Sequence, residues 1–131
     1  MRIRFWVPIF AGLFATSAAT AWAAVTEDEF QLRAFGDLVE LCSAAPADPL
    51  FTAASNFCHG FGVGVVRVLQ EEDAARKSRP LFCLPTPIPT RNEVIASLVT
   101  WAKANPGQMS QPATDGVAAY MSKQFPCARS R

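Results

Sequence analysis

The chain has 131 residues, of which half are hydrophobic, and its 12 lysines and arginines nearly balance its 11 aspartates and glutamates. This balance lacks the basic excess that is typical of nucleic-acid-binding proteins, so we expect no nucleic acid as a partner. The length allows one small domain with one modest core, which has little stability to spare.

The first 23 residues show the pattern of a cleaved secretory signal. A cationic start, Met1 to Arg4, precedes a short apolar run and then small residues that end in an A-x-A cleavage sequence at Ala23. The apolar run is shorter than the roughly 20 residues that a membrane-spanning helix needs. We therefore expect an exported protein without a stable membrane anchor and with a single domain at residues 24–131. Cleavage removes two arginines, so the formal net charge would change from +1 to −1.

The mature chain is expected to begin with a helix. A capping box from Thr26 to Glu29 marks its start, because a threonine at the N-cap and a glutamate three residues later satisfy free backbone amides reciprocally. Apolar residues then recur at spacings of three and four as far as Cys42, which predicts one continuous helix with a buried face. The sequence around Pro46 ends this pattern.

A second helix is predicted to start at Asp48 and to run to about Asp73. Its middle part is apolar and contains three closely spaced glycines, whose spacing does not match the dinucleotide-binding fingerprint, so we expect no cofactor. Gly60 and Gly64 share one bare helical face. We predict that a neighbouring helix packs closely against them, with Phe61 in the same contact.

Residues 74–89 form the least regular part of the chain. They begin with charged side chains and end in alternating prolines, which exclude a helix and favour an extended path. A disulfide at Cys83 would pin this path to the body of the protein. We therefore predict a rigid surface loop, and a rigid loop loses little entropy when it binds a partner.

Two further helices complete the predicted fold. A second capping box, from Thr90 to Glu93, starts the third helix, and the turn sequence at Asn105 ends it. Ser110 is expected to cap a fourth helix, which ends at Phe125. Because no alternation of period two persists long enough for a sheet, we predict an all-α fold, a compact bundle of about four helices stapled by two disulfides.

The two disulfides follow from four cysteines in an exported chain: Cys42, Cys58, Cys83 and Cys127. The spacings contain no C-x-x-C pair, so we expect no metal site. If the third and fourth helices form an antiparallel pair, Cys83 pairs with Cys127 and Cys42 with Cys58. The other open pairing joins Cys58 with Cys83 and Cys42 with Cys127.

The sequence offers no arrangement that is typical of a catalytic site. His59 is the single histidine, and its neighbour Cys58 points elsewhere on a helix and is expected to be oxidised. The acidic run from Glu71 to Asp73 lies beside basic residues and is typical of a solvated face. We therefore predict that the protein is not an enzyme.

A combination of short motifs spans residues 38–127. They are Phe57-Cys58-x-Gly60-Phe61-x-x-Gly64, Cys83-Leu84-Pro85, Trp101-x-x-x-Asn105-Pro106, Ala118-Ala119 and Phe125-Pro126-Cys127. Together they resemble the small periplasmic immunity proteins of the Rap/Tai type, which protect bacteria against peptidoglycan amidase effectors delivered by type VI secretion. That family commonly has a tyrosine in place of Phe61 and an acidic residue in place of Arg67, and a swap of acid for base alters partner preference.

The resemblance implies a periplasmic protein that inhibits by binding. It would cover the catalytic cleft of an amidase effector, as a homodimer or through a protruding loop, so that peptidoglycan cannot enter. By elimination, we place the partner-binding surface on residues 76–90 and the polar end of the second helix, with Arg76, Lys77, Arg79 and Pro87 as contacts.

Two other functions fit the same sequence. One is a disulfide-stapled periplasmic structural or chaperone-like helical protein without a toxin partner. The other is a small-molecule carrier whose pocket is lined by Phe57, Phe61 and Trp101, although these residues make an ordinary core equally well.

Overall fold

The computed structural model describes residues 24–77 and 79–128, so the predicted secretory signal lies outside the described residues. The described part contains four α-helices, two short 3-10 helices and no strand, which confirms the predicted all-α fold. In chain order the elements are η1 (Glu27–Gln31), α1 (Phe35–Cys42), α2 (Phe51–Arg76), α3 (Arg91–Ala104), η2 (Pro106–Gln108) and α4 (Ala113–Gln124).

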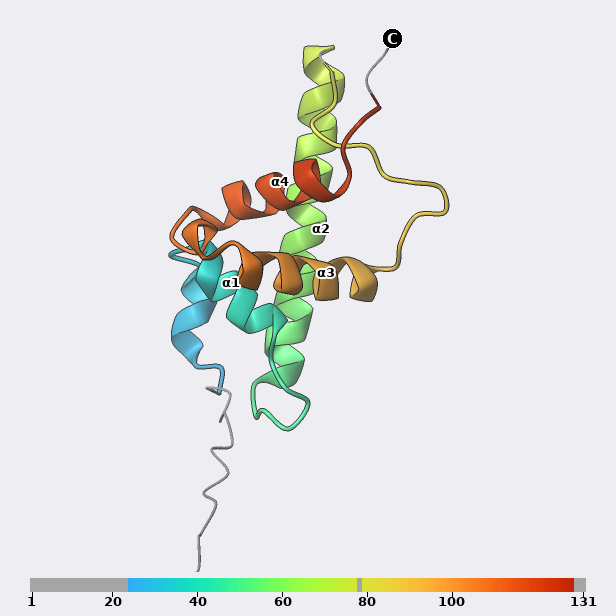
Figure 1. Ribbon diagram of the computed structural model, residues 1–131. Coiled ribbons are helices and arrows are strands. Elements are labelled where there is room, and N and C mark those ends of the chain that lie inside the picture. The colour runs from blue at the N-terminus through green and yellow to red at the C-terminus, as the bar shows by residue number, and fades with distance from the viewer. Residues whose placement is uncertain (1–23, 78, 129–131) are drawn as a thin grey trace, which may run out of the picture.

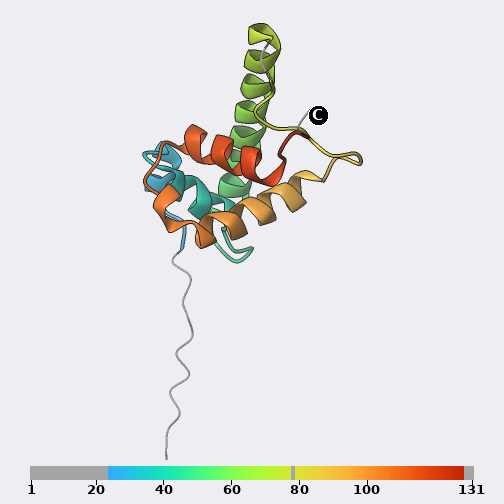
Figure 2. The ribbon, with the colours of Figure 1, turned by 45° about the horizontal axis from the view of Figure 1, so that its top comes forward.

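The helix α2 is the longest element. The helices α1 and α4 pack along part of it, and α3 packs on α1 and α4. Figures 1 and 2 show α1, α3 and α4 gathered beside its N-terminal and middle parts, while its C-terminal end projects beyond them. A second projection is the loop between α2 and α3, which bends away from the body before α3 begins. These two projections therefore present the most protruding surfaces of the described chain.

The prediction of one continuous first helix is wrong, because the structure divides this segment into η1 and α1. The capping box at Thr26 is present, with the Thr26 amide donating to the Glu29 carboxylate at 2.8 Å, but it starts only the short η1. Leu32 then takes a left-handed backbone with φ of 46°, and its amide donates to the Glu29 carbonyl at 3.1 Å. In this position Leu32 packs against both hydrophobic clusters of the protein, which a continuous helix would not allow.

The separate start of α1 lets it dock on the connection that precedes α4. The amides in the first turn of a helix have no partner inside that helix. Here the amide of Phe35 donates to the carbonyl of Gln111 at 2.7 Å, and the amide of Gly36 donates to the carbonyl of Met109 at 2.9 Å. Two segments far apart in the sequence are thus joined by backbone hydrogen bonds.

The main core lies between α1, α3 and α4, and half-buried residues of α2 such as Phe61 and Val65 pack against it. Tyr120 and Phe35 are completely buried in it, and Trp101 links them, with ring centroids 5.8 Å from Tyr120 and 6.2 Å from Phe35. The Tyr120 hydroxyl donates to the carbonyl of Val94 at 3.1 Å. Burial of each such side chain stabilises the fold by about 1.5 to 3 kcal/mol, so this aromatic row holds the three short helices together.

The boundaries of the later helices agree with the sequence prediction in part. The second capping box is present at the start of α3, where the Thr90 hydroxyl accepts from the Glu93 amide at 3.3 Å. The fourth helix starts at Ala113 and not after a Ser110 cap, because Pro112 takes an extended conformation with ψ of 143°. A proline disfavours helical backbone at the residue before it, so Gln111 cannot easily continue a helix capped by Ser110.

The predicted close packing at two glycines of α2 is wrong. Gly60 and Gly64 are exposed, and no neighbouring atom lies within 4 Å of where a Cβ would stand at either position. Their face of α2 points away from the other helices. Phe61, on a different face, is half-buried against the main core and stacks on Phe57 with ring centroids 6.4 Å apart.

Both disulfides join the cysteines that were predicted to pair if the last two helices are antiparallel. Cys42 is bonded to Cys58, with Cα atoms 5.2 Å apart, and Cys83 is bonded to Cys127, with Cα atoms 4.8 Å apart. The first links α1 to α2. The second links the loop after α2 to the segment after α4, so the alternative pairing is wrong.

Candidate partner-binding surface

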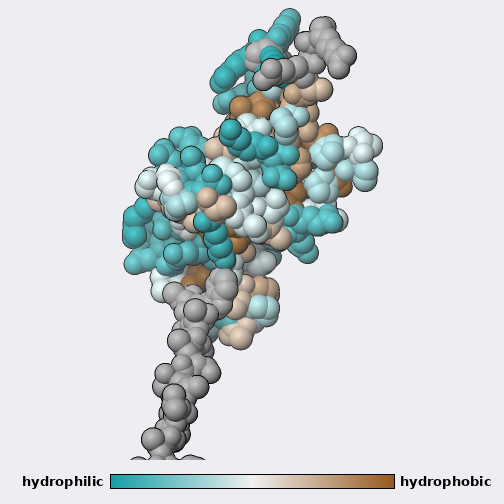
Figure 3. Space-filling view, viewed as in Figure 1, coloured by the Kyte–Doolittle hydropathy of each residue, from teal (hydrophilic) through white to brown (hydrophobic). Residues whose placement is uncertain are grey.

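The projecting end of α2 carries the first of the predicted contact residues. Arg76 is the last residue of the helix and pairs with the Glu72 carboxylate at 2.9 Å, one turn earlier. Lys77 ends the helix in a left-handed conformation with φ of 51°. Both side chains are exposed, and Figure 3 shows hydrophilic residues covering this end of the molecule. The end of α2 is therefore a solvated, charged surface.

The beginning of the loop after α2 is tied to its surroundings by hydrogen bonds. The guanidinium of Arg79 donates to the carbonyl of Cys127 at 3.0 Å and to that of Ala128 at 3.4 Å. The amide of Leu81 donates to the carboxylate of Asp73 at 2.8 Å. Arg79 thus differs from the other two predicted cations, because it already holds residues 127 and 128 against the loop.

Three further contacts fix the centre of the same loop. Phe82 is 5% exposed and belongs to the main core. The next residue, Cys83, donates its amide to the carbonyl of Phe125 at 2.8 Å and is bonded to Cys127. Residues 79–83 are consequently anchored at both the side-chain and the backbone level, as the sequence analysis predicted for Cys83.

The part of the loop beyond this anchor forms an exposed tip at residues 85–88. The Thr86–Pro87 peptide is cis, and both residues are exposed. Ile88 is 69% exposed, which is unusual for a large apolar side chain. The tip and the end of α2 project from the body in different directions (Figures 1 and 2). The structure therefore places Arg76 and Lys77 together and puts Pro87 on a separate surface.

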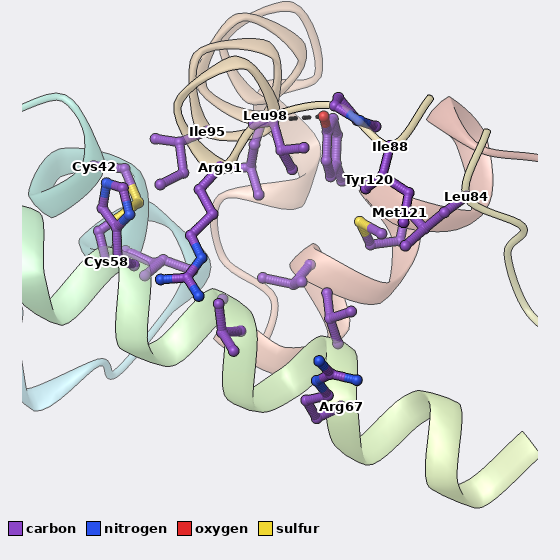
Figure 4. Close-up of a pocket in the computed structure, with 18 of the residues that line it drawn as sticks. Cys42, Cys58, Arg67, Leu84, Ile88, Arg91, Ile95, Leu98, Tyr120 and Met121 are labelled. Carbon is purple, nitrogen blue, oxygen red and sulfur yellow. Dashed lines mark hydrogen bonds between the residues drawn. A yellow bond between two sulfur atoms is a disulfide. The ribbon is translucent and has the colours of Figure 1, made fainter. Parts of the chain in front are cut away.

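A pocket of about 340 Å³ lies between α2, α3, α4 and the loop, and sequence reasoning missed it. Figure 4 shows side chains from all of these elements around one space. Apolar residues supply most of its walls, among them Val63, Val66, Ile95, Leu98, Val117 and Met121. This concave apolar shape with a few polar groups is typical of a small-molecule site.

Two arginines border this pocket, Arg67 from α2 and Arg91 from the first turn of α3. Figure 4 shows the Arg91 guanidinium near Cys58 and the Arg67 guanidinium farther along α2, so the two charges border the pocket at different points. Within the described residues neither side chain takes part in a hydrogen bond or an ion pair. Both charges are therefore available to an anion at the pocket mouth.

The pocket expected from the sequence, lined by Phe57, Phe61 and Trp101, is not the one that forms. Phe57 stacks on Phe61 and also contacts Phe30, while Trp101 packs on Tyr120 in the core. None of the three lines the pocket between α2, α3 and α4. The signal that could have found it is the helical spacing of Val63, Val66 and Arg67 on α2, an apolar face that ends in a cation.

In residues 24–77 and 79–128, no group of three histidine, cysteine or carboxylate side chains could hold a metal ion. No helix in this part of the chain has the length and hydropathy to cross a membrane.

The glutamate beside the loop is Glu93, whose pKa is lowered because its carboxylate accepts hydrogen bonds from the hydroxyl and the amide of Thr90. The base of the loop is thus joined to α3 by a charged cap.

Comparison with known proteins gives one match. The model of a family described as Rap1a immunity proteins matches residues 34–127, well over half of the chain. No curated protein and no solved structure matches. The matched range begins just before α1 and ends at Cys127, so it contains both disulfides and all four α-helices. The chain therefore belongs to the Rap1a immunity proteins, which confirms the type VI secretion immunity family expected from its motifs.

Proposed function

We propose that the protein is a periplasmic immunity protein that neutralises a peptidoglycan amidase effector of type VI secretion by blocking its active site. The observation that carries this proposal is the family match over residues 34–127. Membership of an immunity family implies an effector protein as the partner. Inhibition would require binding alone, without chemistry or a cofactor of its own.

The anchored loop supports a blocking mechanism. Its tip at residues 85–88 is exposed, while the segment before it is held by Phe82, by the Cys83 disulfide and by Arg79. A preorganised loop binds with a small loss of conformational entropy. A narrow projection of this kind can enter a cleft that a flat surface cannot.

The end of α2 supports a second contact. Arg76 and Lys77 are exposed and adjacent, and Lys77 has no ion-pair partner within the described residues. Exposed cations accelerate encounter with an acidic surface and contribute to partner choice. We infer that this surface steers the effector, while the loop tip occupies the cleft.

The function is tested by survival of cells. The protein would be expressed in the periplasm together with each member of a panel of type VI peptidoglycan amidases. We expect survival with at least one amidase that lyses cells in the absence of the protein. Lysis with every amidase that is active in the assay would overturn the amidase assignment.

The surface is tested with charge reversal at the end of α2. The double variant Arg76→Glu and Lys77→Glu should lower affinity for the neutralised amidase by about tenfold or more. Arg79 is kept, because its hydrogen bonds to Cys127 and Ala128 make it part of the fold. The matched control is Arg33→Glu, an exposed cation before α1. Equal affinities in both variants would overturn the assignment of this surface.

The loop tip is tested by the introduction of a bulky side chain. Thr86→Trp adds a large side chain at an exposed position and should abolish protection, because the tip would no longer fit the cleft. Thr52→Trp, at an exposed position in the first turn of α2, is the control and should protect normally. Thermal melts of both variants should match the wild type. Normal protection by Thr86→Trp would exclude the tip from the contact.

A further inference from the structure

We propose that the pocket between α2, α3, α4 and residues 84–89 binds a single-chain anionic amphiphile such as a fatty-acid carboxylate. The alkyl chain would lie in the apolar interior, and the carboxylate would lie at the rim that Arg67 and Arg91 border. This site is separate from the end of α2 and shares Ile88 with the loop tip. The proposal does not depend on the proposed immunity function.

The interior of the pocket selects an alkyl chain. Its floor is formed by Leu98, Val117 and Met121, which are buried members of the main core. The one hydroxyl group nearby belongs to Tyr120, and it already donates to the Val94 carbonyl. The other polar side chains of the lining come from α2 and the start of α3: His59, Arg67, Gln70 and Arg91. A polar ligand group beside Leu98, Val117 and Met121 would therefore stay unpaired, which is unfavourable. The volume of about 340 Å³ falls in the range of small-molecule sites.

The mouth of the pocket selects a negative charge. Arg67 and Arg91 come from different helices, both are exposed, and no aspartate or glutamate is among the residues that line the pocket. Guanidinium groups match the planar geometry of a carboxylate and bind it through paired hydrogen bonds. A cationic amphiphile would meet repulsion at the same place. The two ends of the pocket thus define one ligand class, with an apolar tail and an anionic head.

Gly62 provides part of the space. It lies on the face of α2 that lines the pocket, and no neighbouring atom lies within 4 Å of where its Cβ would stand. A larger side chain at this position would extend into the space between α2 and α3.

Binding can be measured directly on the oxidised protein with dodecanoate below its micellar concentration. Isothermal titration calorimetry should show saturable binding of one dodecanoate per chain. Dodecylamine has the same tail with a cationic head, and butanoate has the same head with a short tail. Each should bind more weakly than dodecanoate by about tenfold or more. Absence of saturable dodecanoate binding, or equal affinity for dodecylamine, would overturn the proposal.

Matched glycine variants locate the ligand. Gly62→Leu should lower dodecanoate affinity by about tenfold or more, because the new side chain fills the pocket. Gly60→Leu changes the same helix at an exposed position outside the pocket and should bind normally. Leucine is a better helix former than glycine, so both variants should fold. Unchanged binding by Gly62→Leu would overturn the site.

Arginine variants test the mouth. The double variant Arg67→Gln and Arg91→Gln should lose the preference for dodecanoate over dodecylamine. Sedimentation velocity on the same samples tests a different occupant, a second copy of the chain. A dimer that persists in saturating dodecanoate, and that Gly62→Leu dissociates, would show that the pocket is a protein interface and would overturn the proposal.

Discussion

The ring of Phe35 on α1 lies directly against the backbone of Gly116 on α4, where a Cβ would overlap it. Phe35 is completely buried, and Gly116 is buried beside it. This contact lets the first and last helices approach closely. It is the kind of contact that the sequence had suggested for Gly60 and Gly64, which the structure leaves in open space.

Gly116→Ala should therefore destabilise the protein. Overpacking a core typically costs about 1 to 3 kcal/mol, which outweighs the gain of about 1 kcal/mol in helix propensity. Gly64→Ala, at an open and exposed position of α2, should instead stabilise the protein slightly. Urea denaturation of both variants checks the prediction. A Gly116→Ala protein as stable as Gly64→Ala would show that α1 and α4 can move apart at no cost.

The two disulfides should contribute unequally to stability. Cys83 and Cys127 are separated by 44 positions, whereas Cys42 and Cys58 are separated by 16. In the chain-entropy model these loops correspond to about 4 and about 3 kcal/mol. Replacing each pair with serine and measuring urea denaturation should give the larger loss for the Cys83 and Cys127 pair. The reverse order would indicate that the unfolded chain retains structure.

The capping box at Thr90 should make stability depend on acid pH. The hydrogen bond from Thr90 lowers the pKa of Glu93 in the folded state. A lowered pKa contributes stability that is fully present above the ordinary glutamate pKa and is lost as the pH falls through the folded pKa. Thr90→Ala should cost about 1 kcal/mol near neutral pH through loss of the cap.

The measurement is a set of thermal melts from neutral to acid pH. The melting temperatures of the wild type and Thr90→Ala should converge as Glu93 becomes protonated. Thr100→Ala removes an exposed hydroxyl that donates a hydrogen bond inside α3, and it serves as the control. The melting temperatures of Thr100→Ala and the wild type should differ by the same amount at every pH. A constant difference for Thr90→Ala as well would contradict the assignment.

Glu40 on α1 should show the opposite dependence on pH. Its pKa is raised in the folded state, first by desolvation and then by the negative charges of Glu29 and Asp37. A carboxylate with a raised pKa favours folding below its ordinary pKa, and this contribution is lost as the pH rises through the folded pKa. Glu40→Gln should therefore raise the melting temperature near neutral pH and have little effect in acid. An equal gain at both pH values would refute the electrostatic cause.

Features set by neighbouring residues in the chain could be predicted well. The capping boxes at Thr26 and Thr90 are local, so they were found from a few letters of sequence. The pairing of Cys83 with Cys127 followed from one assumption about the last two helices. The rigid loop after α2 was predicted from its prolines and from Cys83. In each case, the determining residues lie within one or two turns of one another or are joined covalently.

Features set by distant contacts could not be predicted. The break at Leu32 depends on hydrophobic clusters that form only after folding. The pocket depends on how α2 and α3 diverge, and the helical spacing on α2 indicates only which face of that helix lines it. The sequence shows that the glycines of α2 share one face, but it does not determine which face of a long helix the neighbouring helices cover.

The anchors of the loop after α2 have a consequence for the order of assembly. Both Arg79 and Cys83 bind partners in residues 125–128, at the far end of the described chain. If the chain is exported from its N-terminus, as the proposed periplasmic function requires, those partners arrive last. The bond between Cys42 and Cys58 can close while the remainder is still being translocated, whereas the loop is ordered only once the whole domain has crossed. The protruding surface would thus be completed only in the compartment in which it acts.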